Sequence, residues 1–148
     1  MRLLWVIPLG AASATAANAV FYYLVTAGFG EEFLFPNQFP PPDLAAMPVN
    51  DVIIFSVIFS LGAGIVFAQV SNLARKPIRI YLVIAIVTLF LSFAVPLSIS
   101  SPPVAMSHKL VLVALHVLGA MGVVGTLVAL GRGNNRGNPG QADAELRA

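Results

Sequence analysis

The sequence predicts an all-α integral membrane protein in which four transmembrane helices form a bundle. Three observations lead to this fold class. The 148 residues are 58% apolar and only 9% charged, whereas soluble domains have about 25% charged residues. The apolar residues lie in four long runs, and no run contains Asp, Glu, Lys or Arg in its interior. These features exclude a soluble enzyme, a disordered chain and a coiled coil.

Each apolar run is long enough to cross a bilayer as a helix, which takes about 20 residues. The spans are predicted at about residues 3–27, 52–73, 80–99 and 110–130, within one transmembrane domain that covers residues 1–130. Helices are expected because lipid cannot satisfy exposed backbone polar groups, and because barrel strands would alternate apolar and polar residues. Residues 131–148 contain Gly, Asn, Pro and Gln but no apolar run, which predicts a disordered cytoplasmic tail.

The first run also resembles a secretory signal peptide, because Arg2 precedes a short apolar stretch and two small-residue segments look like cleavage sites. These segments are Ala12-Ser13-Ala14 and Ala17-Asn18-Ala19. The apolar run continues beyond both of them to Val25, so we interpret it as a true span. Cleavage within residues 1–19 is the alternative, and it would leave three spans in the same orientation.

Basic residues lie almost entirely at one set of span ends, which indicates the cytoplasmic side. Seven of the 8 Lys and Arg residues flank these ends: Arg2, Arg75, Lys76, Arg79, Arg132, Arg136 and Arg147. Only Lys109 lies at the opposite ends. The sequence therefore predicts that both termini are cytoplasmic, in a multi-pass protein of the cell inner (cytoplasmic) membrane.

The link between the first two spans, about residues 28–51, is the only long loop and is predicted to lie on the outer side. It contains five prolines, which predict irregular structure through its middle, and the four phenylalanines Phe29, Phe33, Phe35 and Phe39. An aqueous loop rarely needs so many aromatic side chains. We expect them to dip into the membrane interface or to pack over the mouth of the bundle; a lid over a pocket is the alternative.

The short link between the second and third spans carries Arg75, Lys76 and Arg79 around Pro77, which stops one span from running into the next. The simplest interpretation of these charges is that they set the topology. The same three side chains are candidates for binding the head groups of anionic lipids.

Small residues at regular steps predict close contacts between the helices, because membrane helices associate where small side chains let their backbones approach. The stripes are Ser56/Ser60/Gly64/Ala68, Gly10/Ala14/Asn18, Thr88/Ser92/Pro96 and, at steps of three, Gly119/Gly122/Gly125. They predict a compact bundle with one small or polar face on each helix. The same faces are candidates for contact with a second copy of the chain or with a membrane protein partner.

Four polar side chains fall at a similar depth in the outer half of the predicted bundle: Asn18, Ser56, Ser92 and His116. Polar residues within spans are costly in lipid and often functional. All four are placed where they can meet inside the bundle. They would then either hold the helices together by hydrogen bonds or form a site for a ligand or a proton.

The sequence contains no recognisable catalytic or metal-binding set, and no cofactor is expected. His108 and His116 are the only histidines, and their spacing of eight residues makes them a poor pair of haem ligands. The spans contain no carboxylate for a Ser-His-acid triad, and the absence of cysteine excludes disulfides and thiolate zinc sites. The net charge of +2 comes from membrane flanks, so nucleic acid is not an expected partner.

Three short motifs resemble an uncharacterised bacterial family of four-span membrane proteins, known only as a domain of unknown function. They are the Arg-x-Pro-x-Arg turn that begins at Arg75, the Ser-Phe-x-x-Pro stretch that begins at Ser92, and His116 in the last span. The resemblance covers residues 3–130 and implies four helices in a bacterial cytoplasmic membrane. It implies no activity.

The sequence therefore favours a small membrane accessory or binding protein without enzymatic activity. Such a protein would use its helix faces to hold a lipophilic small molecule or a protein partner among the membrane lipids. The alternative is an oligomeric channel or transporter for a small solute, with Asn18 and His116 along its path.

Overall fold

The computed structural model describes residues 3–30, 34–36, 44–98 and 105–131 of the 148. The predicted tail beyond residue 131 lies outside this part of the chain. The described residues are mostly helical, in agreement with the predicted fold class. The elements are α1 (Leu3–Phe29), β1 (Leu34–Pro36), β2 (Leu44–Ala46), α2 (Val49–Leu73), α3 (Pro77–Ser92), α4 (Ala94–Ser98) and α5 (Met106–Gly131).

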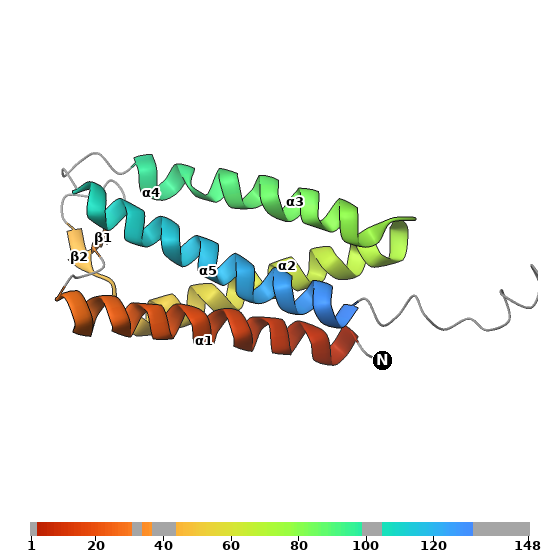
Figure 1. The fold of residues 1–148 in the computed structure, drawn as a ribbon, viewed down its shortest axis with the longest axis horizontal. Coiled ribbons are helices and arrows are strands. Elements are labelled where there is room, and N and C mark those ends of the chain that lie inside the picture. The colour runs from red at the N-terminus through yellow and green to blue at the C-terminus, as the bar shows by residue number, and fades with distance from the viewer. Residues whose placement is uncertain (1–2, 31–33, 37–43, 99–104, 132–148) are drawn as a thin grey trace, which may run out of the picture.

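The long helices lie side by side, with α4 continuing roughly in the direction of α3 (Figure 1). Helix α1 packs most extensively against α5 and next against α2, while α3 packs against α2 and α5. The start of α1, the turn between α2 and α3, and the end of α5 lie at one end of the molecule. The two strands and the start of α5 lie at the opposite end, which we call the strand end.

Three stretches of helix in the described part of the chain are long and apolar enough to cross a membrane. They are α2 with 25 residues, the α3–α4 stretch Pro77–Ser98 with 22 residues, and α5 with 26 residues. Many of their large apolar side chains are exposed, including those of Phe59, Phe90 and Met121. A surface of this kind is expected where a helix faces hydrocarbon, so the structure supports a membrane protein.

The third predicted span is found as the stretch Pro77–Ser98, which is interrupted at Phe93 between α3 and α4. It begins earlier, at Pro77, a residue well suited to the first helical position. Helix α3 ends at Ser92 because Pro96 has no N–H group to donate to the Ser92 carbonyl, and the proline ring crowds that carbonyl. The Phe93 N–H bonds instead to the Phe90 carbonyl, at 3.2 Å. Helix α4 then resumes at Ala94.

The loop before α2 contains a short antiparallel strand pair, β1 and β2, on either side of its middle. Leu34 of β1 pairs with Ala46 of β2, and Pro36 pairs with Leu44. The middle of the loop, with Phe39 and most of the prolines, lies outside the described residues, so its predicted irregularity and the lid alternative stay predictions. Phe33 and the side chains of Phe29 and Phe35 also lie outside them.

The chain between β2 and α2 is held to α1 by a hydrogen bond. The Tyr22 hydroxyl donates to the Met47 carbonyl at 3.0 Å. Pro48, in an extended conformation, then precedes the first residue of α2, Val49, which lies three residues before the predicted start of this span. The strand end of α2 is thereby fixed against α1.

The apolar core consists of two clusters stacked along the molecule. The cluster nearer the α2–α3 turn contains Val6, Ala14, Phe67, Tyr81, Val123 and Leu127. The cluster at the strand end contains Val25, Val52, Leu112 and Leu115, with Tyr22 and Met47 packed against it. Between these clusters along α1 and α2 lie buried polar residues, Asn18, Ser56 and Ser60, which form the candidate site.

Candidate functional site

Asn18 and Ser56 form a buried polar pair between α1 and α2. The Asn18 side-chain amide donates a hydrogen bond to the Ser56 hydroxyl at 2.9 Å. Each residue is only 8% exposed. Of the four polar residues that the sequence singled out, these are the two that the structure joins by a hydrogen bond.

The glycines of α5 let this helix approach α1 closely. A Cβ added at Gly119 would lie 2.9 Å from Asn18 Nδ2, and one added at Gly122 would lie 2.8 Å from Ala14 Cα. Real Cβ atoms do not come this close, so both positions require glycine in this packing. A Cβ at Gly125 would meet no atom within 4 Å, so the predicted glycine stripe holds for two of its three members.

The stripe of small residues on α2 also faces protein, as predicted. Ser56, Ser60 and Gly64 are buried, and Ala68 is half-buried. A Cβ added at Gly64 would lie 2.5 Å from Ile7 Cγ2 of α1. The close approach of α1 and α2 therefore depends on this face.

The stripe predicted on the third span does not form a buried face. Thr88 is exposed and Ser92 is half-buried, while Pro96 is buried in α4. The buried residue of α3 is Tyr81 instead, whose ring packs edge-on against Phe67 at a centroid distance of 4.9 Å.

Ser92 and His116 do not join Asn18 through hydrogen bonds in the structure. The Ser92 hydroxyl donates to the Leu89 carbonyl at 2.7 Å, and His116 Nδ1 lies 2.7 Å from the Leu112 carbonyl. Both partners lie one turn earlier in the same helix. Such local bonds satisfy a polar side chain without a second helix, which explains why the expected contact among the four residues is only half formed.

The local bond of His116 decides which ring nitrogen carries a proton. A carbonyl oxygen can only accept, so Nδ1 must be the protonated nitrogen that donates to Leu112. In the neutral ring, Nε2 then keeps its lone pair and can accept a hydrogen bond or coordinate a ligand. His116 is half-buried, so the structure leaves this nitrogen chemically available on a helix that packs against α1, α2 and α3.

Two buried oxygen atoms at α1 have no hydrogen-bond partner among the described residues. They are Asn18 Oδ1 and Thr15 Oγ1. Such atoms are rare in native proteins, because burying an unpaired polar group costs about 1–3 kcal/mol. Thr15 lines a groove that was not predicted from the sequence.

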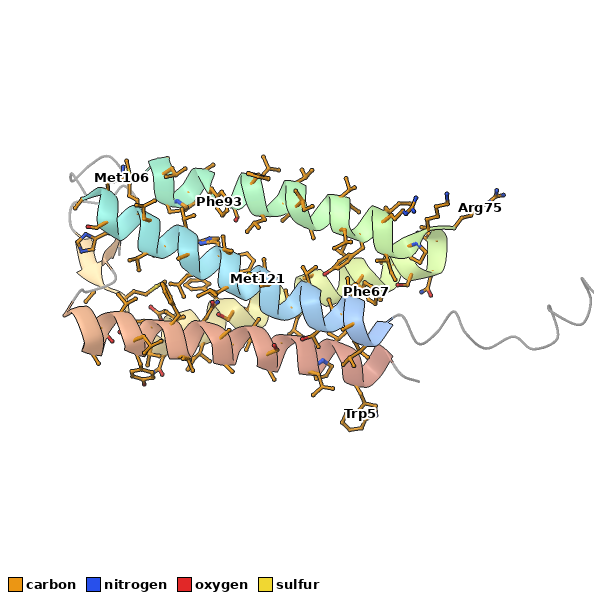
Figure 2. All side chains as sticks on the ribbon, viewed as in Figure 1. Trp5, Phe67, Arg75, Phe93, Met106 and Met121 are labelled. Carbon is orange, nitrogen blue, oxygen red and sulfur yellow. The ribbon has the colours of Figure 1, made fainter. Side chains whose placement is uncertain are left out.

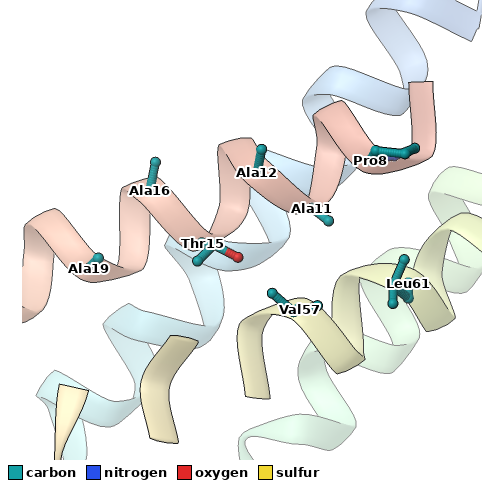
Figure 3. A pocket seen from close by; sticks show the side chains of 8 residues that line it. All are labelled: Pro8, Ala11, Ala12, Thr15, Ala16, Ala19, Val57 and Leu61. Atoms are coloured by element: carbon teal, nitrogen blue, oxygen red, sulfur yellow. The ribbon is translucent and has the colours of Figure 1, made fainter. Parts of the chain in front are cut away.

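This groove runs between α1 and α2 and opens to the side of the molecule, with a volume of about 580 Å³ (Figure 3). Ala11 and Thr15 of α1 point toward Val57 and Leu61 of α2 across it. Its lining is apolar apart from the Thr15 hydroxyl: Pro8, Ala11, Ala12, Thr15, Ala16, Ala19, Val57 and Leu61. The groove could have been inferred from a second stripe in the first span, formed by Pro8, Ala12 and Ala16. This stripe lies beside the Gly10/Ala14/Asn18 stripe, which packs on α5.

The three cations of the α2–α3 turn, Arg75, Lys76 and Arg79, are all exposed. Arg75 points away from the helices at this end of the molecule (Figure 2). No carboxylate in the described part of the chain pairs with them, because Asp51, the acidic residue described there, lies at the strand end of α2. Their charge is therefore directed toward the surroundings.

In the described part of the chain, no group of three or more His, Asp or Glu side chains gathers where it could hold a metal ion. The apolar groove suits a hydrocarbon chain, and the cationic turn suits an anion.

No curated protein and no solved structure matches the chain. The family described as "Family of unknown function (DUF6069)" matches residues 1–133, which include every described helix and strand. The sequence resemblance to a family known only as a domain of unknown function is confirmed, and the chain belongs to this family.

Proposed function

We propose that the chain is a small integral membrane protein of the bacterial cytoplasmic membrane that crosses it four times, with both termini in the cytoplasm. It acts as an accessory or binding protein and not as an enzyme. Three stretches with the length and apolarity of membrane spans support this proposal. The common location of the start of α1, the α2–α3 turn and the end of α5 also supports it (Figure 1), because the cations of the turn then mark the cytoplasmic end.

In this proposal helix α1 is the fourth span, in addition to the three stretches named above. Its 27 residues make a rod of about 40 Å, longer than the hydrocarbon core of about 30 Å. Its exposed face is apolar near both ends, where Trp5 and Leu24 are exposed, and Trp5 points away from the bundle (Figure 2). Its most polar residue, Asn18, is buried against α2 and α5. Apolar side chains on the outside and a polar one on the inside are what lipid requires.

The binding site that we propose is the groove between α1 and α2, and its occupant is the acyl chain of a lipid or a similar lipophilic molecule. The observation that carries this proposal is an apolar groove that opens sideways at the level of the buried Asn18–Ser56 pair. In a membrane, that opening faces hydrocarbon. Acyl chains are the molecules that reach it at the highest concentration.

A channel or transporter formed on an oligomer axis has less support. Its path would have to include Asn18. This side chain of α1 is buried and covered by α2 and α5 of the same chain.

The test is to reconstitute the protein in bilayers that contain a phosphatidylcholine with a photoactivatable acyl chain and to map the cross-links. We expect labelling to concentrate on residues 8–19 and 57–61. Ala12→Trp places a large side chain at the groove and should reduce this labelling severalfold. The matched control is Val83→Trp, at an exposed position of α3, which should leave it unchanged.

Labelling that is spread evenly over α1, α2, α3 and α5, and that is insensitive to Ala12→Trp, would overturn the acyl-chain site. Labelling that is lost when the chain dimerises would assign the groove to a second copy and would contradict the proposal in the same way.

A further inference from the structure

The cations of the α2–α3 turn have no partner among the described residues, unlike Lys109, the remaining described cation. At the strand end, the Lys109 ammonium donates to the Leu97 carbonyl at 3.4 Å. Arg75, Lys76 and Arg79 make no ion pair with any described residue. Asp51 lies 24 residues before Arg75, which corresponds to about 36 Å along a helix. Three positive charges therefore lie close together without a neutralising group in the described chain.

The backbone presents both signs at this turn, because the carbonyl end of α2 and the N–H end of α3 meet there. Helix α2 ends at Leu73, and the Ala74 N–H bonds back to the Val70 carbonyl at 3.0 Å. Lys76 is the N-cap of α3 but makes no capping hydrogen bond with its side chain, and the first intrahelical N–H bond runs from Ile80 to the Lys76 carbonyl. The N–H groups ahead of it have no acceptor within the helix and carry the positive end of the helix dipole.

Apolar side chains flank the three cations. Leu73, at the end of α2, is 84% exposed, and Ile80, in the first turn of α3, is 45% exposed. Such residues favour hydrocarbon, while the long basic side chains reach toward water. The turn thus combines exposed apolar anchors with cations, the combination that a membrane interface accommodates.

We propose that the α2–α3 turn binds the phosphate of an anionic membrane lipid through Arg75, Lys76 and Arg79. This inference rests on the proposed membrane-spanning arrangement and is independent of the α1–α2 groove. The two guanidinium groups and the ammonium group donate hydrogen bonds to phosphate oxygens. Leu73 and Ile80 contact the upper part of the acyl chains. The exposed apolar neighbours are the reason to assign the phosphate to a lipid and not to a soluble anion.

The experiment compares two lipids with identical acyl chains, phosphatidylglycerol and phosphatidylcholine, added to the full chain in a neutral detergent. Lipid binding is counted by native mass spectrometry. We expect phosphatidylglycerol to bind more tightly than phosphatidylcholine, and raising the salt concentration to weaken this preference. The triple variant Arg75→Gln/Lys76→Gln/Arg79→Gln should lower the preference between tenfold and a hundredfold, since each basic residue near an anionic surface contributes about fivefold.

Lys109→Gln is the matched control, because it removes one cation at the strand end, where the ammonium already has a carbonyl partner. It should leave the preference unchanged. A thermal melt of each variant verifies that the fold is retained. An equal loss in Lys109→Gln, or an undiminished preference in the folded triple variant, would overturn the proposed site.

Two further experiments distinguish a lipid phosphate from a free phosphate, and the head-group site from the α1–α2 groove. Inorganic phosphate, added at the concentration of the lipid, should not displace phosphatidylglycerol; displacement would show a site for free anions and would contradict the lipid assignment. Ala12→Trp should not change the phosphatidylglycerol preference. If Ala12→Trp abolishes it while the triple variant does not, the head-group site is wrong and the groove accounts for the binding.

Discussion

Asn18 Nδ2 lies 2.9 Å from Ser56 Oγ, and this hydrogen bond joins the middle of α1 to α2 between the two apolar clusters of the core. The same amide nitrogen faces Gly119 of α5, where an added Cβ would lie 2.9 Å from it. Three helices therefore meet at one asparagine. Packing of apolar side chains alone would not fix the position of the helices along their axes, whereas this polar contact does.

Removing this pair should destabilise the fold by a modest amount. Hydrogen bonds between membrane helices contribute about 0.6 kcal/mol on average and up to about 1.7 kcal/mol. We expect Asn18→Ala and Ser56→Ala each to lower the free energy of unfolding, with a coupling energy in this range. The measurement is a double-mutant cycle by reversible unfolding in mixed micelles.

Thr88→Ala is the control for the loss of a hydroxyl from a helix, because Thr88 is exposed on α3. It should change the free energy of unfolding by less than either single variant. Strictly additive effects of Asn18→Ala and Ser56→Ala would show that the hydrogen bond does not contribute to stability.

The glycines of α5 should respond in opposite ways to the same substitution. Gly122→Ala places a Cβ 2.8 Å from Ala14 Cα and 2.9 Å from Ala14 N, backbone atoms that cannot rotate away. Overpacking of this kind costs about 1–3 kcal/mol. Gly125→Ala meets open space and should raise stability by up to about 1 kcal/mol, because alanine favours the helix.

Thermal unfolding in one detergent distinguishes the two variants. The melting temperature should fall for Gly122→Ala and stay level or rise for Gly125→Ala. A fall of equal size in both variants would mean that α5 does not present Gly122 to α1, and the packing of these helices would have to be revised.

The apolar runs were sufficient to predict where the helices lie. A charged residue inside a run would be costly in lipid, so the runs locate the helices, although α2 and α3 each begin three residues before their predicted starts. The buried faces of α1 and α2 were also predictable, because small residues let helices approach closely; at Gly64 even an added Cβ would lie 2.5 Å from Ile7 Cγ2. Whether α1 crosses the membrane stays a prediction.

The break at Phe93 and the polar contacts depend on choices that a pattern does not reveal. Membrane helices often tolerate proline, so Pro96 did not by itself indicate that α3 would end at Ser92. Serine and histidine can bond within their own helix as easily as across to another, and the sequence does not show which bond forms. The groove follows from the angle between α1 and α2, which small side chains permit but do not specify.

The predicted orientation can be tested by reporter fusions. With seven of eight basic residues at one set of span ends, a reporter fused after Ala148 should be active in the cytoplasm. A reporter inserted at Asn37 should be active outside. Replacing Arg75, Lys76 and Arg79 by Gln should weaken this bias but not invert it, since other basic residues of the set remain. A C-terminal reporter active only outside the cytoplasm would contradict both the topology and the lipid site at the α2–α3 turn.

His116 provides a test of whether a polar residue within α5 has a role beyond structure. Its Nδ1 donates to the Leu112 carbonyl at 2.7 Å, so ¹⁵N NMR of the labelled ring should show a protonated Nδ1. The bond is local and should contribute no more than about 1 kcal/mol, so both His116→Leu and His116→Gln should fold.

If Nε2 accepts a hydrogen bond from a lipophilic ligand, both variants should lose affinity for ligands that carry a hydroxyl group. Their affinity for ligands without a hydroxyl group should stay the same, and their melting temperatures should stay within a few degrees of that of the unmodified chain. A proton found on Nε2 and not on Nδ1 would contradict the local bond. Unchanged affinity for every ligand would leave His116 with a structural role alone.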